Sequence, residues 1–332
     1  DGPIICRKSV VASIGLGGSP RPRVGVKPPP GGAVGGCPAV PPGDVVHLVE
    51  GSSIVQPGKS VQTHKYTHGH ALILSGGAGH TGAARLAARG ALRIGAGVVS
   101  LGVPGAAQHE VACQITALML RRIEDGNALA EALSDKRINA LCLGPGMGVD
   151  RARDLVPVAL RDDGAPRVLD ADALTAFSDA PAALFDLLHV NCVLTPHAGE
   201  FARLFPDIAA KLDAPPAKGP AYSKVDATRA AAARAGCVVL FKGPDTVIAA
   251  PDGRCAINSA HYDRAAPWLA TAGSGDVLAG FITGLMARGF APMQAAQTAA
   301  WLHVEAARTF GPGLTAEDLP ETLPAVLRAL AG

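Results

Sequence analysis

Residues 71–104 read ALILSGGAGHTGAARLAARGALRIGAGVVSLGVP. The stretch contains an apolar run at Ala71–Leu74, a glycine-rich turn, an alanine-rich segment over 82–94 and a second apolar run at Val98–Val103. Short apolar runs bounded by turn residues are typical of buried strands, and the segment between them has a helical composition. Two parallel strands need a crossover connection, which is usually a helix. The stretch therefore predicts a strand–helix–strand unit of a parallel sheet.

The same alternation continues along the rest of the chain. Further strands are expected at Ala140–Leu143, Val168–Leu169, Cys192–Leu194, Val238–Phe241 and Thr246–Ala249. Helices are expected at 82–94, 105–113, 127–135, 150–160, 173–177, 199–205, 226–235, 276–288, 293–309 and 320–330. Repeated crossovers cover both faces of a sheet, so the expected fold class is α/β, with three α/β/α layers and a mainly parallel central sheet. Ligands of such sheets bind beyond the carboxyl ends of the strands, where the motifs described below should meet.

Residues 1–63 have a different composition. Ten prolines and twelve glycines fall within residues 1–68, and the apolar residues there show little periodicity. A segment of this kind buries too little apolar surface to offset the loss of chain entropy on folding. We therefore expect residues 1–63 to be a disordered extension or the remnant of a linker, and residues 64–332 to form the folded domain.

The composition of the whole chain excludes several classes of protein. Its 332 residues carry a net charge of +2 with acids and bases interspersed, which is not the basic footprint of a nucleic-acid-binding protein. No apolar run reaches the roughly 18–20 residues that a membrane-spanning helix needs. None of the seven cysteines forms a C-x-x-C pair, and several lie in apolar runs. We interpret them as buried thiols in a reducing cytoplasm.

The strongest candidate site is Thr271-Ala272-Gly273-Ser274-Gly275-Asp276. Apolar residues recur at helical spacing after it, which predicts a helix over 276–288. The glycines then precede a helix N-terminus, whose free N–H groups and positive dipole end bind anions. Asp276 would fall in the first turn, where a carboxylate also stabilises a helix by itself, by about 0.3–1 kcal/mol. Three closely spaced small residues before the carboxylate favour a site at which a phosphate group meets a catalytic base.

Two further glycine-rich loops follow apolar runs. The first, Ser75–Gly82, contains a G-x-G-x-x-G pattern like that of dinucleotide-binding proteins. That interpretation requires an acid at the end of the second strand, and Val98–Pro104 contains none, so it is rejected. A tight turn near a ligand and simple close packing both remain open for this loop. The second loop, Gly144–Gly148, is weak evidence alone because glycines in turns usually serve the backbone.

Charged residues follow two other strands. Asp170 and Asp172 lie at a strand end, where they either cap the next helix or contact a metal ion or substrate. The segment Lys242–Thr246 is a turn that opens with a cation, and Lys242 is either a solvated strand end or a phosphate contact.

The segment Leu194–Glu200 predicts the start of a helix. Thr195 would be the cap and Pro196 would lie in the first turn, where proline is favoured. His197 and Glu200 would then lie near the edge of the sheet. A lone histidine serves structure as readily as function, so both roles remain open for His197.

These segments, in this order and spacing, resemble the ribokinase-like superfamily and, within it, the ADP-dependent NAD(P)H-hydrate dehydratase family. The resemblance covers about residues 64–330 and rests most specifically on residues 82–97, Thr195–Glu200 and Gly273–Asp276. Sugar and vitamin kinases of the superfamily commonly carry Asn where this chain has His197, which favours the dehydratase. The alternative is a kinase for the hydroxyl of a sugar or vitamin precursor. The intact Gly273–Asp276 segment disfavours a catalytically silent nucleotide-binding or assembly protein.

The resemblance implies a lyase that repairs nicotinamide nucleotides. Water adds to the nicotinamide ring of NADH or NADPH and gives a useless 6-hydroxy hydrate. The family is thought to transfer phosphate to that hydroxyl, in the S epimer, from ADP or, in many eukaryotic members, from ATP. Phosphate is a better leaving group than hydroxide, so its departure restores NAD(P)H, with AMP and phosphate as the released products.

The resemblance also implies roles for individual residues. Asp276 would be the general base that takes the hydroxyl proton. The expected anion hole consists of Gly273, Ser274 and Gly275. The expected ADP- or AMP-binding residues are Lys242, Gly243, Pro244, Asp245, Thr246 and Gly275. The expected lining of the hydrate pocket is Ala83, Gly146, His197 and Asp276. Mg²⁺ is expected with the nucleotide, and Glu200 and Asp170 are its candidate water-mediated ligands.

The implied partners are small molecules, NAD(P)H hydrate and ADP, rather than nucleic acid or a membrane. Family members often form homotetramers, so we expect a homo-oligomer. They act together with an NAD(P)H-hydrate epimerase, which is fused or separate. Residues 1–68 are too few for a fused epimerase domain and do not resemble a folded part of one.

Overall fold

The computed structural model describes residues 45–55, 57–59, 64–161, 164–215 and 220–331, which fold around a ten-stranded sheet. The strands, in their order across the sheet, are β1 (Val46–Leu48), β10 (Cys255–Ser259), β9 (Asp245–Ala249), β8 (Val238–Phe241), β7 (Cys192–Leu194), β6 (Arg167–Leu169), β5 (Ile138–Leu143), β2 (His70–Leu74), β3 (Val98–Val103) and β4 (Met119–Arg122). Neighbouring strands are parallel, except that β9 runs antiparallel to both β8 and β10. The prediction of a mainly parallel sheet is therefore confirmed.

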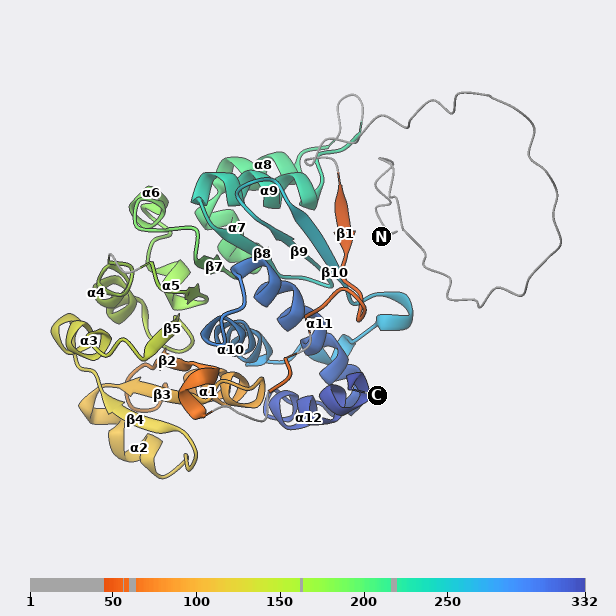
Figure 1. Ribbon diagram of the computed structural model, residues 1–332. Helices are drawn as coiled ribbons and strands as arrows, with labels where there is room; N and C mark the ends of the chain where they lie inside the picture. The colour runs from red at the N-terminus through yellow and green to blue at the C-terminus, as the bar shows by residue number, and fades with distance from the viewer. Residues whose placement is uncertain (1–44, 56, 60–63, 162–163, 216–219, 332) are drawn as a thin grey trace, which may run out of the picture.

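Helices cover both faces of the sheet, as Figure 1 shows. One layer contains α1 (Gly82–Arg93), α2 (Gln108–Ala112), α10 (Ser274–Ala287), α11 (Pro292–Phe310) and α12 (Asp318–Leu330). The other contains α3 (Gly126–Leu133), α4 (Val149–Ala159), α5 (Asp172–Thr175), α6 (Pro181–Phe185), α7 (Ala198–Leu204), α8 (Pro206–Asp213) and α9 (Lys224–Ala235). The three-layer α/β/α prediction is thus also confirmed. Among the described residues, no helix is both long and apolar enough to cross a membrane.

Each central strand contributes side chains to both layers. In β2, Ala71 and Ile73 pack against the α1 side, whereas Leu72 and Leu74 pack against the opposite helices. Successive side chains of a strand point to opposite faces, so a strand covered on both faces is apolar throughout. This is why β2 was recognisable as a continuous apolar run.

Three strands lie outside the sequence-based expectation, namely β1, β4 and β10. β4 forms one edge of the sheet and is exposed at both ends and half-buried between them, so it shows no continuous apolar run. β10 ends in the polar residues Asn258 and Ser259 and pairs with the antiparallel strand β9. Local sequence is a weak guide to such strands because their pairing, more than their composition, defines them.

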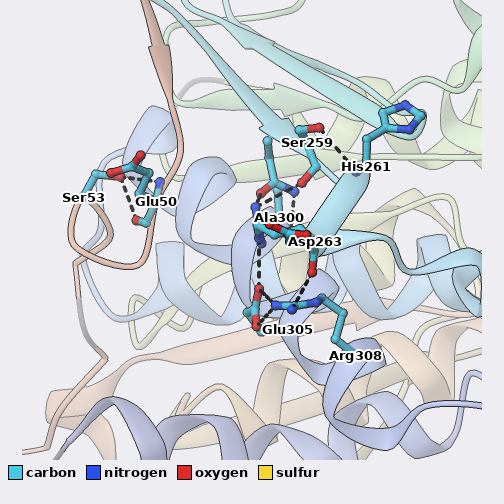
Figure 2. Close-up of polar contacts among 10 residues, drawn as sticks. Glu50, Ser53, Ser259, His261, Asp263, Ala300, Glu305 and Arg308 are labelled. Carbon is cyan, nitrogen blue, oxygen red and sulfur yellow. Dashed lines mark hydrogen bonds and ion pairs between the residues drawn. The ribbon is translucent and has the colours of Figure 1, made fainter. Parts of the chain in front are cut away.

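The strand β1 corrects the expectation that residues 1–63 are disordered as a whole. It pairs in parallel with β10, and Arg229 of α9 donates to the carbonyl oxygen of Val45 at 2.8 Å. In the turn that follows, the Ser53 hydroxyl donates to the Glu50 carbonyl oxygen at 2.8 Å and accepts the Glu50 N–H at 2.9 Å (Figure 2). Within the expected extension, residues 1–44, 56 and 60–63 lie outside the described residues.

The loops after β2 and β5 meet at the point where the strand order reverses. From β2 the chain builds β3 and β4 on one side, and then β5 to β8 on the other. The loop after β2 leads to α1 in one layer, and the loop after β5 leads to α4 in the other. The loops touch, since a Cβ on Gly76 would lie 1.9 Å from the carbonyl oxygen of Gly146. Such a reversal is the usual place for a ligand in an open α/β sheet.

Small residues bring α10 close to α1. The buried face of α1 consists of alanines and one glycine. A Cβ on Gly280 of α10 would lie 2.0 Å from the carbonyl oxygen of Ala87, so only glycine fits at this crossing. The abundance of alanine and glycine in the sequence therefore serves close helix packing.

Candidate active site

α10 begins directly after Gly273, whose φ of 89° belongs to the left-handed region that favours glycine. A Cβ at this position would also lie 2.7 Å from a leucine side chain of α1. In the first turn, the Cβ position of Gly275 is 3.4 Å from Lys242 Nζ and 3.9 Å from Asp170 Oδ2. The expected helix start after Gly273 is therefore formed, and an ammonium group and a carboxylate lie beside it.

Ser274 is held from two sides. Its hydroxyl donates to the carbonyl oxygen of Leu269 at 2.8 Å, and its carbonyl oxygen accepts the Nε2–H of His303 at 2.8 Å. His303 belongs to α11, and its ring is buried edge-on against Phe281 of α10. Burial lowers the pKa of His303 to about 4, so this imidazole is neutral at neutral pH. A neutral histidine thus ties the glycine-rich loop to α11.

Three carboxylates and one ammonium group gather at this edge of the sheet. Lys242 Nζ lies 2.6 Å from Asp170 Oδ1 and 3.9 Å from Glu200 Oε2, and both carboxylate side chains are buried. Asp276 interacts electrostatically with the other three groups. Three negative charges and one positive charge would sum to −2. A phosphate group bound here would therefore need a cation beside it or protonation of a carboxylate.

Burial and mutual repulsion set the pKa values in this cluster. Burial, reinforced by Asp170, raises the pKa of Asp276 to about 7, although Lys242 opposes the shift. Burial also raises the pKa of Glu200, against the attraction of Lys242. Burial alone would lower the pKa of Lys242, but Asp170 and Glu200 outweigh it and raise that pKa. Asp276 is therefore a group that can exchange a proton near neutral pH.

The start of α7 corrects the expected capping residue. The cap is His197, whose Nδ1 accepts the N–H groups of Gly199 at 3.0 Å and Glu200 at 3.3 Å. Glu200 in turn accepts the N–H of His197 at 2.8 Å, which completes a capping box. Thr195 and Pro196 precede the helix instead of opening it. Histidine is outside the usual set of capping residues, so the sequence pattern misplaced the start.

Ala83 and Gly146, two of the residues expected to line the hydrate pocket, lie side by side. A Cβ on Gly146 would be 3.2 Å from the Cβ of Ala83. In the same loop, a Cβ on Gly144 would be 1.7 Å from the carbonyl oxygen of Asp170. One continuous loop therefore connects the Ala83 side of the sheet edge to the carboxylate cluster.

The loop before α1 is anchored by Glu110 of α2. Its carboxylate accepts the hydroxyl of Thr81 and, at 2.7 Å, the N–H of Gly79. These two hydrogen bonds, the one from Thr81 first, lower the pKa of Glu110. An ionised carboxylate therefore fixes the glycine-rich turn that precedes Ala83.

The expected nucleotide loop, Lys242–Thr246, consists of the turn between β8 and β9 and the first two residues of β9, at the same edge. The N–H of Lys242 donates to the Pro196 carbonyl oxygen at 2.9 Å, which links the loop to the start of α7. The N–H of Ala260 donates to the Pro244 carbonyl oxygen at 2.8 Å, which links it to the end of β10. The structure thus places this backbone loop beside the carboxylate cluster.

A polar network connects the segment after β10 to α11 (Figure 2). Arg264 donates to Glu305 and to Asn258 Oδ1, each at 3.0 Å. Arg308 donates to Glu305 at 2.7 Å and to the Asp263 carbonyl oxygen at 2.7 Å. The segment between β10 and Gly273–Asp276 is therefore held against α11.

The two acids after β6 have separate roles. Asp170 faces Lys242, whereas Asp172 accepts the N–H of Gly148 at 2.8 Å and so fastens the loop after β5. Ala171 between them has a φ of 46°, an unfavourable value for a residue with a Cβ. Such local strain is typical of functional sites. Here it occurs between two carboxylates that have different partners.

A dedicated metal cage is absent from the described residues, because no three His, Cys, Asp or Glu side chains are grouped to hold an ion. Asp170 and Glu200, the candidate water-mediated ligands, are bonded to Lys242 and to the His197 N–H. Two carboxylates that already have protein partners fit a Mg²⁺ ion that arrives with nucleotide phosphates and keeps several of its water ligands.

Comparison with known proteins agrees with this geometry. A family model described as NAD(P)H-hydrate dehydratase matches residues 71–325. The chain belongs to the NAD(P)H-hydrate dehydratase family. The bifunctional NAD(P)H-hydrate repair enzyme of Moorella thermoacetica is 38% identical over 290 residues, which is 82% of this chain and 52% of that protein. The ADP-dependent (S)-NAD(P)H-hydrate dehydratase of Neisseria meningitidis is 35% identical over 253 residues, 75% of this chain and 79% of that protein.

Solved structures that resemble this chain include a member of the dehydratase family. The ADP/ATP-dependent NAD(P)H-hydrate dehydratase of Bacillus subtilis, co-crystallised with ATP and Mg²⁺, has a TM-score of 0.70 and 26% identity, covering 86% of this chain and 99% of that one. A ribokinase-like superfamily protein of Enterococcus faecalis, 19% identical with a TM-score of 0.70 over 86% of this chain and 96% of that one, supports the fold. The chain spans about half the length of the bifunctional relatives that it matches.

Sequence reasoning did not single out Glu110, Lys224 or His303. His303 gave the clearest signal, since it interrupts the apolar face of an alanine-rich helix. Glu110 and Lys224 gave none, because charged residues are common on exposed helix faces. In this dehydratase family member all three contact loops of the candidate site.

Proposed function

We propose that the chain catalyses the ADP-dependent dehydration of the S epimer of NADH or NADPH hydrate, a hydro-lyase reaction that returns NAD(P)H and releases AMP and phosphate. The observation that carries the proposal is the place of Asp276, in the first turn of α10 with a pKa of about 7. Its neighbours are the Gly275 backbone and the Lys242 ammonium. A phosphate site next to a base is what phosphate transfer to a hydroxyl requires. Family membership and the names of the relatives support the substrate.

The proposed reaction has two stages. In the first, the Asp276 carboxylate accepts the proton of the ring hydroxyl while the hydroxyl oxygen attacks the β-phosphorus of ADP. The bond from that phosphorus to AMP breaks, and AMP leaves with its electron pair. In the second, the ring carbon–oxygen bond breaks and phosphate leaves with the electron pair. The ring nitrogen lone pair supports this departure, and loss of a proton from the adjacent carbon restores the reduced nicotinamide.

The surrounding residues would act mainly by positioning and by charge. Gly273, Ser274 and Gly275 would hold the transferring phosphate, and the loop Lys242–Thr246 would hold the nucleotide. The hydrate would lie against Ala83, Gly146 and His197. Positioning and electrostatic stabilisation supply most of the catalysis in phosphoryl transfer.

Mg²⁺ would neutralise phosphate charge when bound with the nucleotide. Asp170 and Glu200 would contact its water ligands while keeping their bonds to Lys242 and the His197 N–H. The net charge of −2 in the ionised cluster gives a physical reason for requiring such a cation.

The decisive experiment incubates the purified chain with NADH hydrate, Mg²⁺ and either ADP or ATP. Recovery of the reduced-nicotinamide absorbance, with one AMP and one phosphate released per NADH when ADP is used, is the expected result. A stable phosphorylated product from a sugar or vitamin alcohol, with no response to NADH hydrate, would instead establish the kinase alternative.

We also propose that this activity depends on an epimerase for the other hydrate epimer. Longer relatives, of which the matched region covers about half, are named bifunctional repair enzymes. Turnover of the R epimer is expected only after an NAD(P)H-hydrate epimerase is added. We further propose that the chain forms a homotetramer and acts in the cytoplasm. Light scattering after size-exclusion chromatography measures the oligomeric state.

A further inference from the structure

Lys224 lies beneath the loop Lys242–Thr246. It is the first residue of α9, and its Nζ donates to the carbonyl oxygens of Lys242 at 3.0 Å and Asp245 at 2.7 Å. The same ammonium lies 4.3 Å from the centroid of the Phe241 ring. A single side chain therefore joins the first and fourth residues of the loop and rests on the strand that leads into it.

The carbonyl oxygens of residues 242–245 in this loop accept hydrogen bonds from the protein. Two of these oxygens accept from Lys224, that of Gly243 accepts the Thr246 hydroxyl at 2.9 Å, and that of Pro244 accepts the Ala260 N–H at 2.8 Å. Carbonyl oxygens carry partial negative charge and would repel a phosphate group. Engaging the carbonyl oxygens of residues 242–245 with donors of the protein prepares the loop for an anion.

The ammonium also occupies space that a side chain at Gly243 would need. A Cβ on Gly243, whose φ is 154°, would lie 2.7 Å from Lys224 Nζ. Glycine and lysine at these two positions are therefore matched to each other. Removing the ammonium leaves a gap under the backbone that glycine is too small to fill.

We propose that Lys224 is the positioning residue of the nucleotide loop, and that binding of a nucleoside diphosphate is coupled to the protonation of Lys224. This inference rests on the proposed function, because it takes Lys242–Thr246 to be the nucleotide loop. Lys224 acts through the backbone of that loop rather than on the reacting atoms.

The charges around Lys224 determine how the coupling responds to pH. Burial lowers the pKa of Lys224 to about 8, and the Asp245 carboxylate opposes this shift. The other charged groups nearby have partners of their own. Asp245 Oδ2 lies 3.6 Å from His261 Nε2, and the Asp226 carboxylate accepts the Ser223 hydroxyl. The Lys242 ammonium pairs with Asp170. The atoms that contact the Lys224 ammonium directly are two carbonyl oxygens and a ring, all of them neutral.

Binding of a diphosphate adds negative charge and favours the protonated amine. ADP therefore binds with uptake of a proton when the pH exceeds the pKa of the free protein. The expected consequence is that ADP affinity falls above pH 8 by up to about tenfold per pH unit. Arginine stays protonated in this range, so Lys224→Arg should abolish the dependence.

The test measures the Kd of ADP by titration calorimetry between pH 7 and pH 9.5. All proteins carry Asp276→Asn, which removes turnover and the titration of that carboxyl. Within this background, Lys224→Arg should bind ADP with an affinity independent of pH, and Lys224→Met should bind at least about tenfold more weakly at pH 7. Lys211→Met is the matched control, since the Lys211 ammonium lies over the Tyr222 ring outside the site. It should behave like the parent.

Amide hydrogen exchange provides a second readout that does not require a ligand. Lys224→Met should accelerate exchange in the loop Lys242–Thr246 while leaving β5 and β6 unchanged. The same pH dependence of ADP binding in the Lys224→Arg protein as in its parent would overturn the inference and leave the proposed function intact. Failure of the parent itself to bind ADP at any pH would overturn both.

Discussion

The reactivity of Asp276 comes from its surroundings. Burial and Asp170 oppose its ionisation and Lys242 favours it, with a resulting pKa of about 7. A general base must be ionised, so kcat should rise with pH through about 7 and level off above it. Asp276→Asn should lower kcat by about a hundred- to ten-thousand-fold while changing the Kd of ADP little. The kcat–pH profile and calorimetry measure these effects, and full turnover by the variant would refute the assignment.

The same residue should cost the protein stability. Its pKa is higher in the folded chain than the ordinary value of 3.8, so the folded state loses stability as pH rises from about 4 to about 7. Asp276→Asn removes this cost and should raise the free energy of unfolding at pH 8 by up to about 4 kcal/mol. Urea denaturation at pH 8 and at pH 3.5 tests this, since the gain should vanish at the lower pH.

His303 should limit stability in acid. Its pKa is about 4 in the folded protein and 6.5 ordinarily, so the unfolded chain binds the proton more tightly. Stability contributed by the neutral ring is complete above pH 6.5 and falls by about 3 kcal/mol as the pH approaches 4. In His303→Gln, an amide replaces the imidazole as donor to Ser274 and does not titrate. Chemical denaturation from pH 7 to pH 4.5 should therefore show a shallower decline for this variant, and parallel curves would contradict the prediction.

At the scale of elements, the loop between β2 and α1 depends on a contact from α2. Glu110 supplies two acceptor contacts to that loop, and its pKa is lowered, so it stays ionised at neutral pH. Glu110→Ala should raise the KM for the hydrate by about tenfold with little change in kcat, because both charge-assisted hydrogen bonds to the loop are lost. Steady-state kinetics measure KM and kcat separately. Glu131→Ala, on the exposed face of α3, is the control and should leave both constants unchanged.

At the scale of the whole molecule, the sheet extends into the proline- and glycine-rich segment. β1 pairs with β10, and the Cβ position of Gly51 lies 2.9 Å from the Trp301 ring of α11. A chain beginning at Val45 should therefore be more stable than one beginning at His64, by about 2 kcal/mol for the lost backbone hydrogen bonds and burial. Thermal and urea unfolding of the two truncated chains measure the difference. Equal stability would place the domain boundary at His64, as the sequence suggested.

Much of the architecture follows from local patterns. Apolar runs separated by alanine-rich segments dictated strands, crossovers and three layers, because a sheet covered on both faces needs apolar residues throughout. The Gly273–Asp276 segment likewise predicted an anion-binding helix start, since glycine before a helix is a local backbone feature. Parallel strands end at one edge, which is why motifs after β2, β5, β6, β7 and β8 were expected to meet.

Tertiary structure decided the rest. The pKa of Asp276 depends on burial and on Asp170, and the contacts of Lys224 and His303 come from helices distant in the chain from the loops they hold. Strands β1 and β10 exist through their pairing with each other and with β9. Sequence periodicity records which face of an element is buried. It does not record which side chains of other elements meet that face, and these contacts set charge, protonation and loop position at the candidate site.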